Sequence, residues 1–314
     1  VCEQLAPFHV ADYSGRMWLF QNKVMDFCVT PNHRMWSACG YPGAPWQEVT
    51  ADRIAGRKGW KVPVAGLPVP GQDEPFVLPH IEYHVKDTQS NRNEIAIEAG
   101  DWAEFLGWYI AEGNSDVKVH ISQRLSAHPD NCRRIAELLR RLPFGWCYTE
   151  ANSQFHISSK RLATYLKQFG LCRDKFIPDW VFSQSPAVRQ RFLDGYLAGD
   201  GTHDRSHRAP EYNGAGTMSA RLASDLQRLL IYQGYSANIS CYTSGIWRVG
   251  IHSRRHRILE GRNWQEIDYD GRIYCPTVPT GYVVTRRNGK ILIAGNTNPS
   301  QIFETVLGKI AAKT

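Results

Sequence analysis

Two similar stretches of sequence decide the fold: Phe105-Leu-Gly-Trp-Tyr-Ile-Ala-Glu-Gly113 and Phe192-Leu-Asp-Gly-Tyr-Leu-Ala-Gly-Asp-Gly201. Both are apolar and end in an acid followed by glycine, so we predict two helices that stop at these glycines. Each has small residues four positions apart, Gly107 with Ala111 in the first and Gly195 with Gly199 in the second. This spacing clears one helix face, so that the two backbones can approach closely.

The beginnings of these helices also have sequence signals. Asp101 followed by Glu104 matches a capping box and predicts the start of the first helix. Ser185 followed by Pro186 at the first helical position predicts the start of the second helix.

The segments that follow each helix form an internal repeat. After the first helix we expect a strand over 117–121, a helix over 135–142, a strand over 153–157 and a helix over 162–169. After the second we expect a helix over 219–233 and strands over 237–242 and 247–251. The acids Glu112 and Asp200 hold equivalent places 88 residues apart. Self-similarity at a fixed spacing predicts two copies of one structural unit.

The paired acids suggest a metal site. A carboxylate at a helix C-terminus faces the negative end of the helix dipole, and two such carboxylates brought together repel each other. A divalent cation relieves both effects, and Mg²⁺ held by carboxylates and a phosphate oxygen supports phosphodiester hydrolysis. One acid of this kind is equally explained as a solvated helix-end residue. Two copies, Glu112 and Asp200, favour the shared site.

The paired helices resemble the LAGLIDADG motifs of two-repeat homing endonucleases, over residues 95–255. The segment 175–181, Lys-Phe-Ile-Pro-Asp-Trp-Val, resembles the one that this family places before its second motif. The resemblance implies an α+β domain with two pseudo-symmetric αββαββα repeats, which acts as a monomer on double-stranded DNA. It also implies that Glu112 and Asp200 bind Mg²⁺ and that Lys175 is a basic catalytic helper, although Lys175 is also explained as a surface charge.

Positive charge supports a DNA partner. The chain has 37 Lys and Arg against 30 Asp and Glu, and residues 100–260 hold 21 of the former against 15 of the latter. Arginine suits phosphates and guanine edges. The candidate DNA-binding residues are the arginines in or beside the predicted strands of the repeat: Arg124, Arg205, Arg208, Arg248, Arg254 and Arg255.

The two ends of the chain are strand-like. Short β-favouring runs occur over 16–20, 25–29 and 60–64, and strands return after Gly271, with a hairpin turn at Asn288-Gly289. We therefore expect one β domain, made of residues 1–88 and 257–296, interrupted by an endonuclease domain over 89–256. Residues 297–314 follow this β domain as a separate segment.

Chain-cleavage chemistry is available at these ends. Thr30 and His33 stand in a Thr-x-x-His turn, which can place a hydroxyl and an imidazole on one peptide bond, although the turn is also ordinary Pro-Asn turn chemistry. The side-chain amide of Asn296 can attack its own carbonyl and cleave the chain, and the hydroxyl of Thr297 can accept an acyl group.

This arrangement resembles the Hint fold of inteins, which carry out autocatalytic protein splicing. The resemblance implies that Asn296 is the last intein residue and Thr297 the first residue of the following host segment. Cys275 stands where other inteins carry Asp and would be an acid–base group or a buried structural thiol. Gly295 stands where many inteins carry His.

The start of the chain does not match the opening of an intein. We interpret the N-terminal strands and the first nucleophile as absent, so the chain would be either the C-terminal piece of an atypically split intein that needs a short N-terminal partner fragment, or a truncated form of a longer intein. Residues 298–312 resemble a stretch of an RNA polymerase β subunit, the expected host.

Other classes fit less well. No apolar run approaches the length of a membrane span, and eight cysteines without CxxC spacing favour a reduced cytoplasmic protein of a phage or microbe. Two alternatives remain open: a homing endonuclease without splicing activity, and a non-cleaving nucleic-acid-binding protein or RNA maturase.

Overall fold

The computed structural model describes residues 9–81, 93–203, 212–276, 278 and 280–295. Its fold is mixed, with both helices and strands, as the sequence predicts. The chain divides into two compact units. Unit 1 comprises residues 1–66, 235–238 and 254–314, and unit 2 comprises residues 67–234 and 239–253.

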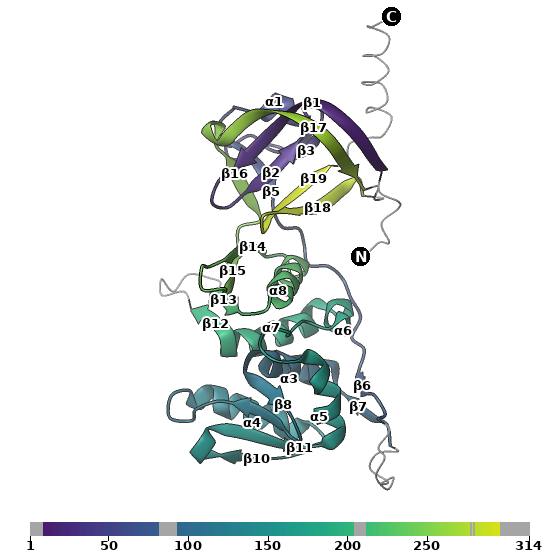
Figure 1. Ribbon diagram of the computed structural model, residues 1–314, viewed down its shortest axis with the longest axis vertical. Helices are drawn as coiled ribbons and strands as arrows, with labels where there is room; N and C mark the ends of the chain where they lie inside the picture. Colours follow the sequence, from purple (N-terminus) through teal and green to yellow (C-terminus); the bar gives the residue numbers. More distant parts are fainter. Residues whose placement is uncertain (1–8, 82–92, 204–211, 277, 279, 296–314) are drawn as a thin grey trace, which may run out of the picture. The chain divides into compact units, whose positions relative to one another are not determined.

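Unit 1 joins the two ends of the sequence. Strand β1 (His9–Gln21) lies antiparallel to β17 (Trp264–Cys275), in a ladder from the pair His9 and Cys275 to the pair Phe20 and Trp264 (Figure 1). Strand β2 (Asp26–Val29) pairs with the other edge of β1, so the sheet order is β17-β1-β2. In the described residues, β segments from the beginning and the end of the sequence thus pair within one unit.

The remaining strands of unit 1 form antiparallel pairs. They are β3 (Arg34–Ser37) with β4 (Gln47–Thr50), β5 (Trp60–Pro63) with β16 (His256–Leu259), and β18 (Tyr282–Arg287) with β19 (Lys290–Gly295). A single turn of helix, α1 (Ala51–Ile54), follows β4, and the 3₁₀ turn η3 (Gly261–Asn263) precedes β17. Asn288 and Gly289 both have positive φ, which confirms the predicted tight hairpin between β18 and β19.

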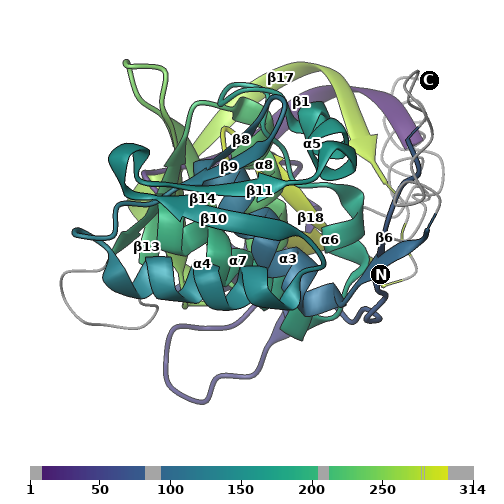
Figure 2. The ribbon, with the colours of Figure 1, turned by 90° about the horizontal axis from the view of Figure 1, so that it is seen from below.

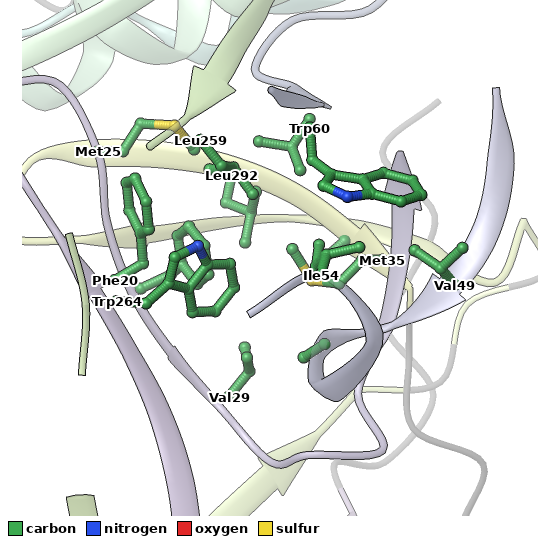
Figure 3. Packing of buried hydrophobic residues seen from close by; sticks show 14 of the residues in the cluster. Phe20, Met25, Val29, Met35, Val49, Ile54, Trp60, Leu259, Trp264 and Leu292 are labelled. Carbon is green, nitrogen blue, oxygen red and sulfur yellow. The ribbon is translucent and has the colours of Figure 1, made fainter. Parts of the chain in front are cut away.

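The core of unit 1 is assembled across the interruption. Phe20 stacks on Phe27, and both rings meet the edge of Trp264. Figure 3 shows Leu259 and Leu292, from the late part of the chain, in the same cluster as residues from its first 64 positions. Burial of these apolar side chains holds the two ends of the sequence together.

The first half of unit 2 is a complete αββαββα repeat. Its sheet has the order β10-β11-β9-β8, and Figure 2 shows its strands running across the helices. The elements are α3 (Ala99–Glu112), β8 (Gly113–Ser115), β9 (Val119–Ser122), α4 (Pro129–Arg141), β10 (Gly145–Thr149), η1 (Glu150–Asn152), β11 (Gln154–Ser158), α5 (Lys160–Leu166) and η2 (Lys167–Phe169). The pair β6 (Phe76–Leu78) and β7 (Ile95–Ile97) precedes α3.

The second half has the same strand order, β12-β13-β15-β14, which confirms the internal repeat. Its elements are α6 (Asp179–Ser183), α7 (Pro186–Asp200), β12 (Gly201–His203), β13 (Tyr212–Thr217), α8 (Ala220–Tyr232), β14 (Ser236–Cys241) and β15 (Trp247–His252). The prediction of two full αββαββα repeats is wrong for this half. Between β15 and β16 the described chain has no helix, because it continues directly into a strand of unit 1.

The two long helices start differently. Ser185 caps α7 as predicted, and its hydroxyl accepts from the backbone NH of Val188. The predicted capping box of α3 is wrong, because Glu98 caps this helix through the backbone NH groups of Gly100 and Asp101. Asp101 and Glu104 instead form ion pairs with arginines on neighbouring helices: Arg134, Arg141 and Arg191.

The packing boundary differs from the predicted one. Residues 67–81, which begin in a Pro- and Gly-rich stretch, belong to unit 2 and not to the β unit before them. Arg161 explains part of this, because its guanidinium donates to the backbone carbonyls of Leu78, Pro79 and Asn93. Within the described part of the chain, no helix is both long and apolar enough to cross a membrane.

Candidate active site

Helices α3 and α7 pack through their glycine faces. A Cβ atom on Gly195 would lie 2.6 Å from the carbonyl oxygen of Glu104, and one on Gly199 would lie 2.7 Å from the Cβ of Ala111. Contacts below 3 Å leave no room for a side chain, so glycine is required at both places. The predicted close approach of the two backbones is confirmed.

The approach brings the two terminal acids together. Glu112 is the last residue of α3 and Asp200 the last residue of α7. The Cβ position on Gly199, next to Asp200, lies 3.0 Å from the Cγ of Glu112. Burial, and then the nearby charge of Glu112, raise the pKa of Asp200 to about 7. Burial also raises the pKa of Glu112. Two repelling, half-buried carboxylates therefore end the two helices.

These two carboxylates suit a hard divalent cation. Mg²⁺ prefers oxygen ligands and keeps several water molecules, so one or two carboxylates and a substrate phosphate are sufficient for it. Among the residues that the structure describes, no group of three His, Cys, Asp or Glu side chains is arranged around a common point. The donor set therefore fits a cation that Glu112 and Asp200 share with a substrate, and it does not fit a closed structural metal site.

Lys175 lies beside Asp200. Its ammonium donates to the carbonyl of Gly113 at 2.9 Å and to that of Tyr109 at 3.3 Å, and it lies 4.0 Å from the centre of the Tyr109 ring. Burial lowers the pKa of Lys175 to about 8, while the charge of Asp200 opposes that effect. The side chain is 5% exposed, which excludes the alternative of a solvated surface charge.

Each acid lines its own cavity. The cavity at Asp200 has a volume of about 510 Å³, and its lining includes Lys175, Asn114 and Thr217. The cavity at Glu112 has a volume of about 290 Å³, and its polar lining residues are Ser122, Gln123, Arg124, His128, Asn131, Asn152 and Ser153. The two acids thus line two different cavities, and residues of both repeats contribute to each cavity.

The predicted DNA-binding arginines are dispersed. Arg124 lines the cavity of Glu112, and Arg248 on β15 donates to Asn213 and Tyr242. Arg254 and Arg255 belong to unit 1, after the last strand of the repeat, so the structure does not place them on its sheet. Arg205 and Arg208 lie outside the described residues.

The Thr30-x-x-His33 turn of unit 1 is formed. The backbone NH of His33 donates to the carbonyl of Thr30 at 3.0 Å, and the Thr30 hydroxyl donates to Oδ1 of Asn32 at 2.8 Å. Burial, and then the charge of Arg34, lower the pKa of His33 to about 4. Cys275 is buried at the end of β17. The turn thus holds a neutral imidazole.

The last described strand ends next to this turn. A Cβ on Gly295 would lie 2.6 Å from the Cβ of Arg34 and 2.9 Å from its carbonyl oxygen. Arg34 also forms an ion pair with Glu48, which accepts a hydrogen bond from Tyr282. Asn296 and Thr297 lie outside the described residues.

Three groups in these regions were not predicted from the sequence: His128, Gln123 and Arg34. His128 had a usable signal, because it stands directly before the helix of the first repeat where the second repeat has Ser219. No sequence signal pointed to Arg34, since only folding brings it against Gly295.

Comparison with known proteins gives the following relatives. No protein-family model matches the chain. The chain is 24% identical, over 95% of its length, to the DNA-directed RNA polymerase subunit beta C-terminal section of Stigeoclonium helveticum. It is 26% identical, over 74% of its length, to the ATP-dependent Clp protease proteolytic subunit of Chlamydomonas moewusii. It is 28% identical, over 54% of its length, to a DNA polymerase of Thermococcus sp. (strain GE8). The matches cover only 33%, 24% and 10% of these three relatives.

Two solved structures are also similar to part of the chain. One is a mesophilic variant of the homing endonuclease I-DmoI, with a TM-score of 0.37 and 15% identity, covering 49% of this chain and 88% of that one. The other is the N-terminal LAGLIDADG domain of DUF199/WhiA, with a TM-score of 0.33 and 16% identity, covering 49% of this chain and 76% of that one.

The three sequence relatives are named for unrelated reactions, so what they share with this chain is the aligned segment. The chain is thus similar in sequence to parts of proteins with unrelated reactions, and about half of it is similar to solved structures of LAGLIDADG proteins.

Proposed function

We propose that this chain is an intein whose unit 2 is a homing endonuclease that cuts double-stranded DNA with Mg²⁺, and whose unit 1 carries out protein splicing. The observation that carries the nuclease proposal is the pair of half-buried carboxylates, Glu112 and Asp200, at the adjoining ends of α3 and α7. Lys175 does not compensate this pair fully, since the pKa of Asp200 stays raised in spite of its charge.

The residues of unit 2 suit phosphodiester hydrolysis. Glu112 and Asp200 would hold Mg²⁺, which supplies a hydroxide and stabilises the charge that develops on the phosphate. Lys175 lies beside Asp200 and would add positive charge to the same phosphate. Arg124 would do so in the cavity of Glu112. Two cavities, one at each acid, would serve the two DNA strands.

The sheet faces of the repeats would contact the duplex. Along β9 and β11, residues alternate between buried and half-exposed, so that His120, Ser122 and His156 share the face opposite the core. In the second repeat Arg248 stands on the corresponding strand β15. Polar strand faces of this kind can present hydrogen-bonding groups to base edges.

Splicing is proposed on three observations. Part of the chain aligns within three enzymes with unrelated reactions, which is expected of an element carried inside different hosts. The Thr30–His33 turn presents a half-buried imidazole whose pKa is lowered to about 4. Strand β19 ends beside Arg34, directly before the proposed junction of Asn296 and Thr297. Asn296 would cyclise and release the segment that begins with Thr297.

Two substitutions test the two activities separately. The DNA site is first recovered by incubating the chain and Mg²⁺ with a randomised duplex library and sequencing the cut ends. Asp200→Asn should abolish cutting of a plasmid with that site, while release of the 297–314 peptide, followed by mass spectrometry, continues. Asn296→Ala should block the release and leave cutting unchanged.

Each variant is the control for the other. If Asp200→Asn cuts at the wild-type rate, the nuclease site is wrongly assigned. If Asn296→Ala still releases the peptide, or if the wild-type chain stays intact when N-terminal fragments are supplied, the splicing proposal fails and an endonuclease without splicing remains.

A further inference from the structure

We propose that His128 is a further catalytic residue in the Glu112 half of the nuclease site, where its imidazole NH donates a hydrogen bond to the leaving 3′-oxygen of the cut strand. This inference rests on the proposed DNA cleavage and names a residue that serves only one of the two strands.

The first observation is the position of the side chain. His128 lines the cavity of Glu112 together with Arg124 and Asn131. Its charge reaches Glu112, because it opposes the rise of that carboxyl's pKa. An imidazole in this cavity would therefore lie beside a phosphate that shares a cation with Glu112.

The second observation is a buried acceptor without a partner in the same cavity. Gln123 is 6% exposed, and its Oε1 atom accepts no hydrogen bond from any described residue. A buried acceptor of this kind costs about 1–3 kcal/mol unless a ligand or water satisfies it. Gln123 Oε1 could accept from the attacking water, on the opposite side of the phosphate from the leaving oxygen that His128 would contact.

The third observation is that the local structure does not explain a histidine here. His128 precedes α4, but its side chain makes no capping hydrogen bond. Ser219 holds the same place before α8, where its hydroxyl accepts from the backbone NH of Leu222 and donates to the carbonyl of Lys175. Serine is among the preferred residues at this position and histidine is not. The first repeat thus forgoes a stabilising cap, as functional positions often do.

The two halves of the site would therefore use different donors. The Asp200 cavity contains the ammonium of Lys175. Among the described residues that line the Glu112 cavity there is no lysine, and its cationic or N–H donor side chains include Arg124 and His128. If Arg124 contacts a non-bridging phosphate oxygen, His128 is left for the leaving oxygen.

The reaction step balances without a further reactant. The oxygen of water bonds to phosphorus, the bond from phosphorus to the 3′-oxygen breaks, and its electron pair stays on that oxygen. The imidazole NH stabilises this developing charge, and solvent supplies the proton of the final 3′-hydroxyl while it takes up the proton from the attacking water.

His128→Ser separates the catalytic role from the structural one. Serine restores the cap that the second repeat has, so the melting temperature should rise. Cleavage of the strand served by Glu112 should nevertheless slow by about 10²–10³-fold, the usual effect of losing one such donor. The other strand should be cut at the wild-type rate, so a supercoiled plasmid with the recovered site should accumulate as the nicked circle. His128→Gln, which keeps an NH donor, should recover part of the rate, and the exposed Ser126→Ala in the same loop should change nothing.

The outcomes are distinguishable. If the wild-type chain cuts no DNA, the proposed function itself fails. If the wild-type chain cuts but His128→Ser and His128→Gln both cut the two strands at its rate, the inference fails and the nuclease proposal stands. Equal slowing of both strands would assign His128 a structural role and would also overturn the inference.

Discussion

Gly107 of α3 lies against Gly195 of α7 with no space for a side chain between them. A Cβ atom on Gly107 would stand 3.2 Å from the carbonyl carbon of Gly195 and 2.3 Å from the carbonyl oxygen of Phe192. This contact sets the separation of the two helix axes. It therefore also sets the separation of the carboxylates at the helix ends.

Gly107→Ala should push the helices apart. Alanine favours a helix by about 1 kcal/mol relative to glycine, but overpacking a rigid backbone contact costs about 1–3 kcal/mol, so we expect a net loss of stability. Because both acids would move, cutting of both DNA strands should slow together. Urea unfolding and plasmid cleavage measure the two effects.

Gly145→Ala is the matched control for this change. Gly145 starts β10 in the same unit, and a Cβ there would have no neighbour within 4 Å. This variant should unfold and cleave as the wild type does. If Gly107→Ala behaves in the same way, the helix contact does not position the acids.

The sequence predicted the parts of the fold that depend on local pattern. The acid-ended helices, the strands after them and the Asn288-Gly289 turn follow from periodicity and turn chemistry, and the structure has them. The predicted start of α3 was wrong because Asp101 and Glu104 have the spacing of a capping box. In the folded protein both carboxylates instead form ion pairs with Arg191, which is distant in sequence.

The site was only partly predictable for the same reason. Glu112, Asp200 and Lys175 stood out because two of them repeat at one spacing and the third lies in a recognisable segment. Gln123 became visible only in the folded chain, where the end of β9 and the start of α4 line one cavity, whereas His128 already differed from the serine at its place in the second repeat. Hydrophobic periodicity also could not predict that the described part of the second repeat lacks a third helix. After β15 the chain continues into β16, which pairs with β5 of unit 1.

The raised pKa of Asp200 predicts how stability depends on pH. Its ordinary pKa is 3.8 and its pKa in the folded protein is about 7, so folding favours the protonated form. This contribution to stability is complete below about pH 4 and is lost as the pH rises to 7. In EDTA, the free energy of unfolding of the wild type should fall between about pH 4 and pH 7 relative to that of Asp200→Asn. If the unfolding free energies of the two proteins changed in parallel with pH, the pKa of Asp200 would not be raised in the folded protein.

Mg²⁺ should reverse that loss. A cation that binds the folded state alone stabilises it in proportion to the logarithm of its concentration above the dissociation constant. At pH 8 we expect the melting temperature of the wild type to rise with Mg²⁺ concentration. The double variant Glu112→Gln, Asp200→Asn should show no such rise, and an equal rise in both proteins would locate the cation elsewhere.

Lys175→Met should separate charge from packing. The lowered pKa of Lys175, about 8 against 10.5, means that wild-type stability rises between pH 8 and pH 10.5, because only the unfolded chain stays protonated there. The variant should lose this rise and should fold well at pH 7, since methionine fills a similar volume without a buried charge. Cleavage should slow by about 10²-fold or more, because the charge beside Asp200 is gone. Cleavage at the wild-type rate would return Lys175 to a purely structural role.

Gly295→Ala tests the junction between β19 and the Thr30–His33 turn. An added Cβ would meet both the Cβ and the carbonyl oxygen of Arg34, so the end of β19 must shift. We expect a loss of about 1–3 kcal/mol in stability and slower release of the 297–314 peptide, with DNA cutting by unit 2 unchanged. Gly66→Ala, where a Cβ has no neighbour within 4 Å, is the control in unit 1. If the Gly295 variant releases the peptide at the wild-type rate, the fit of Gly295 against Arg34 has no part in cleavage, and the glycine there is explained by packing alone.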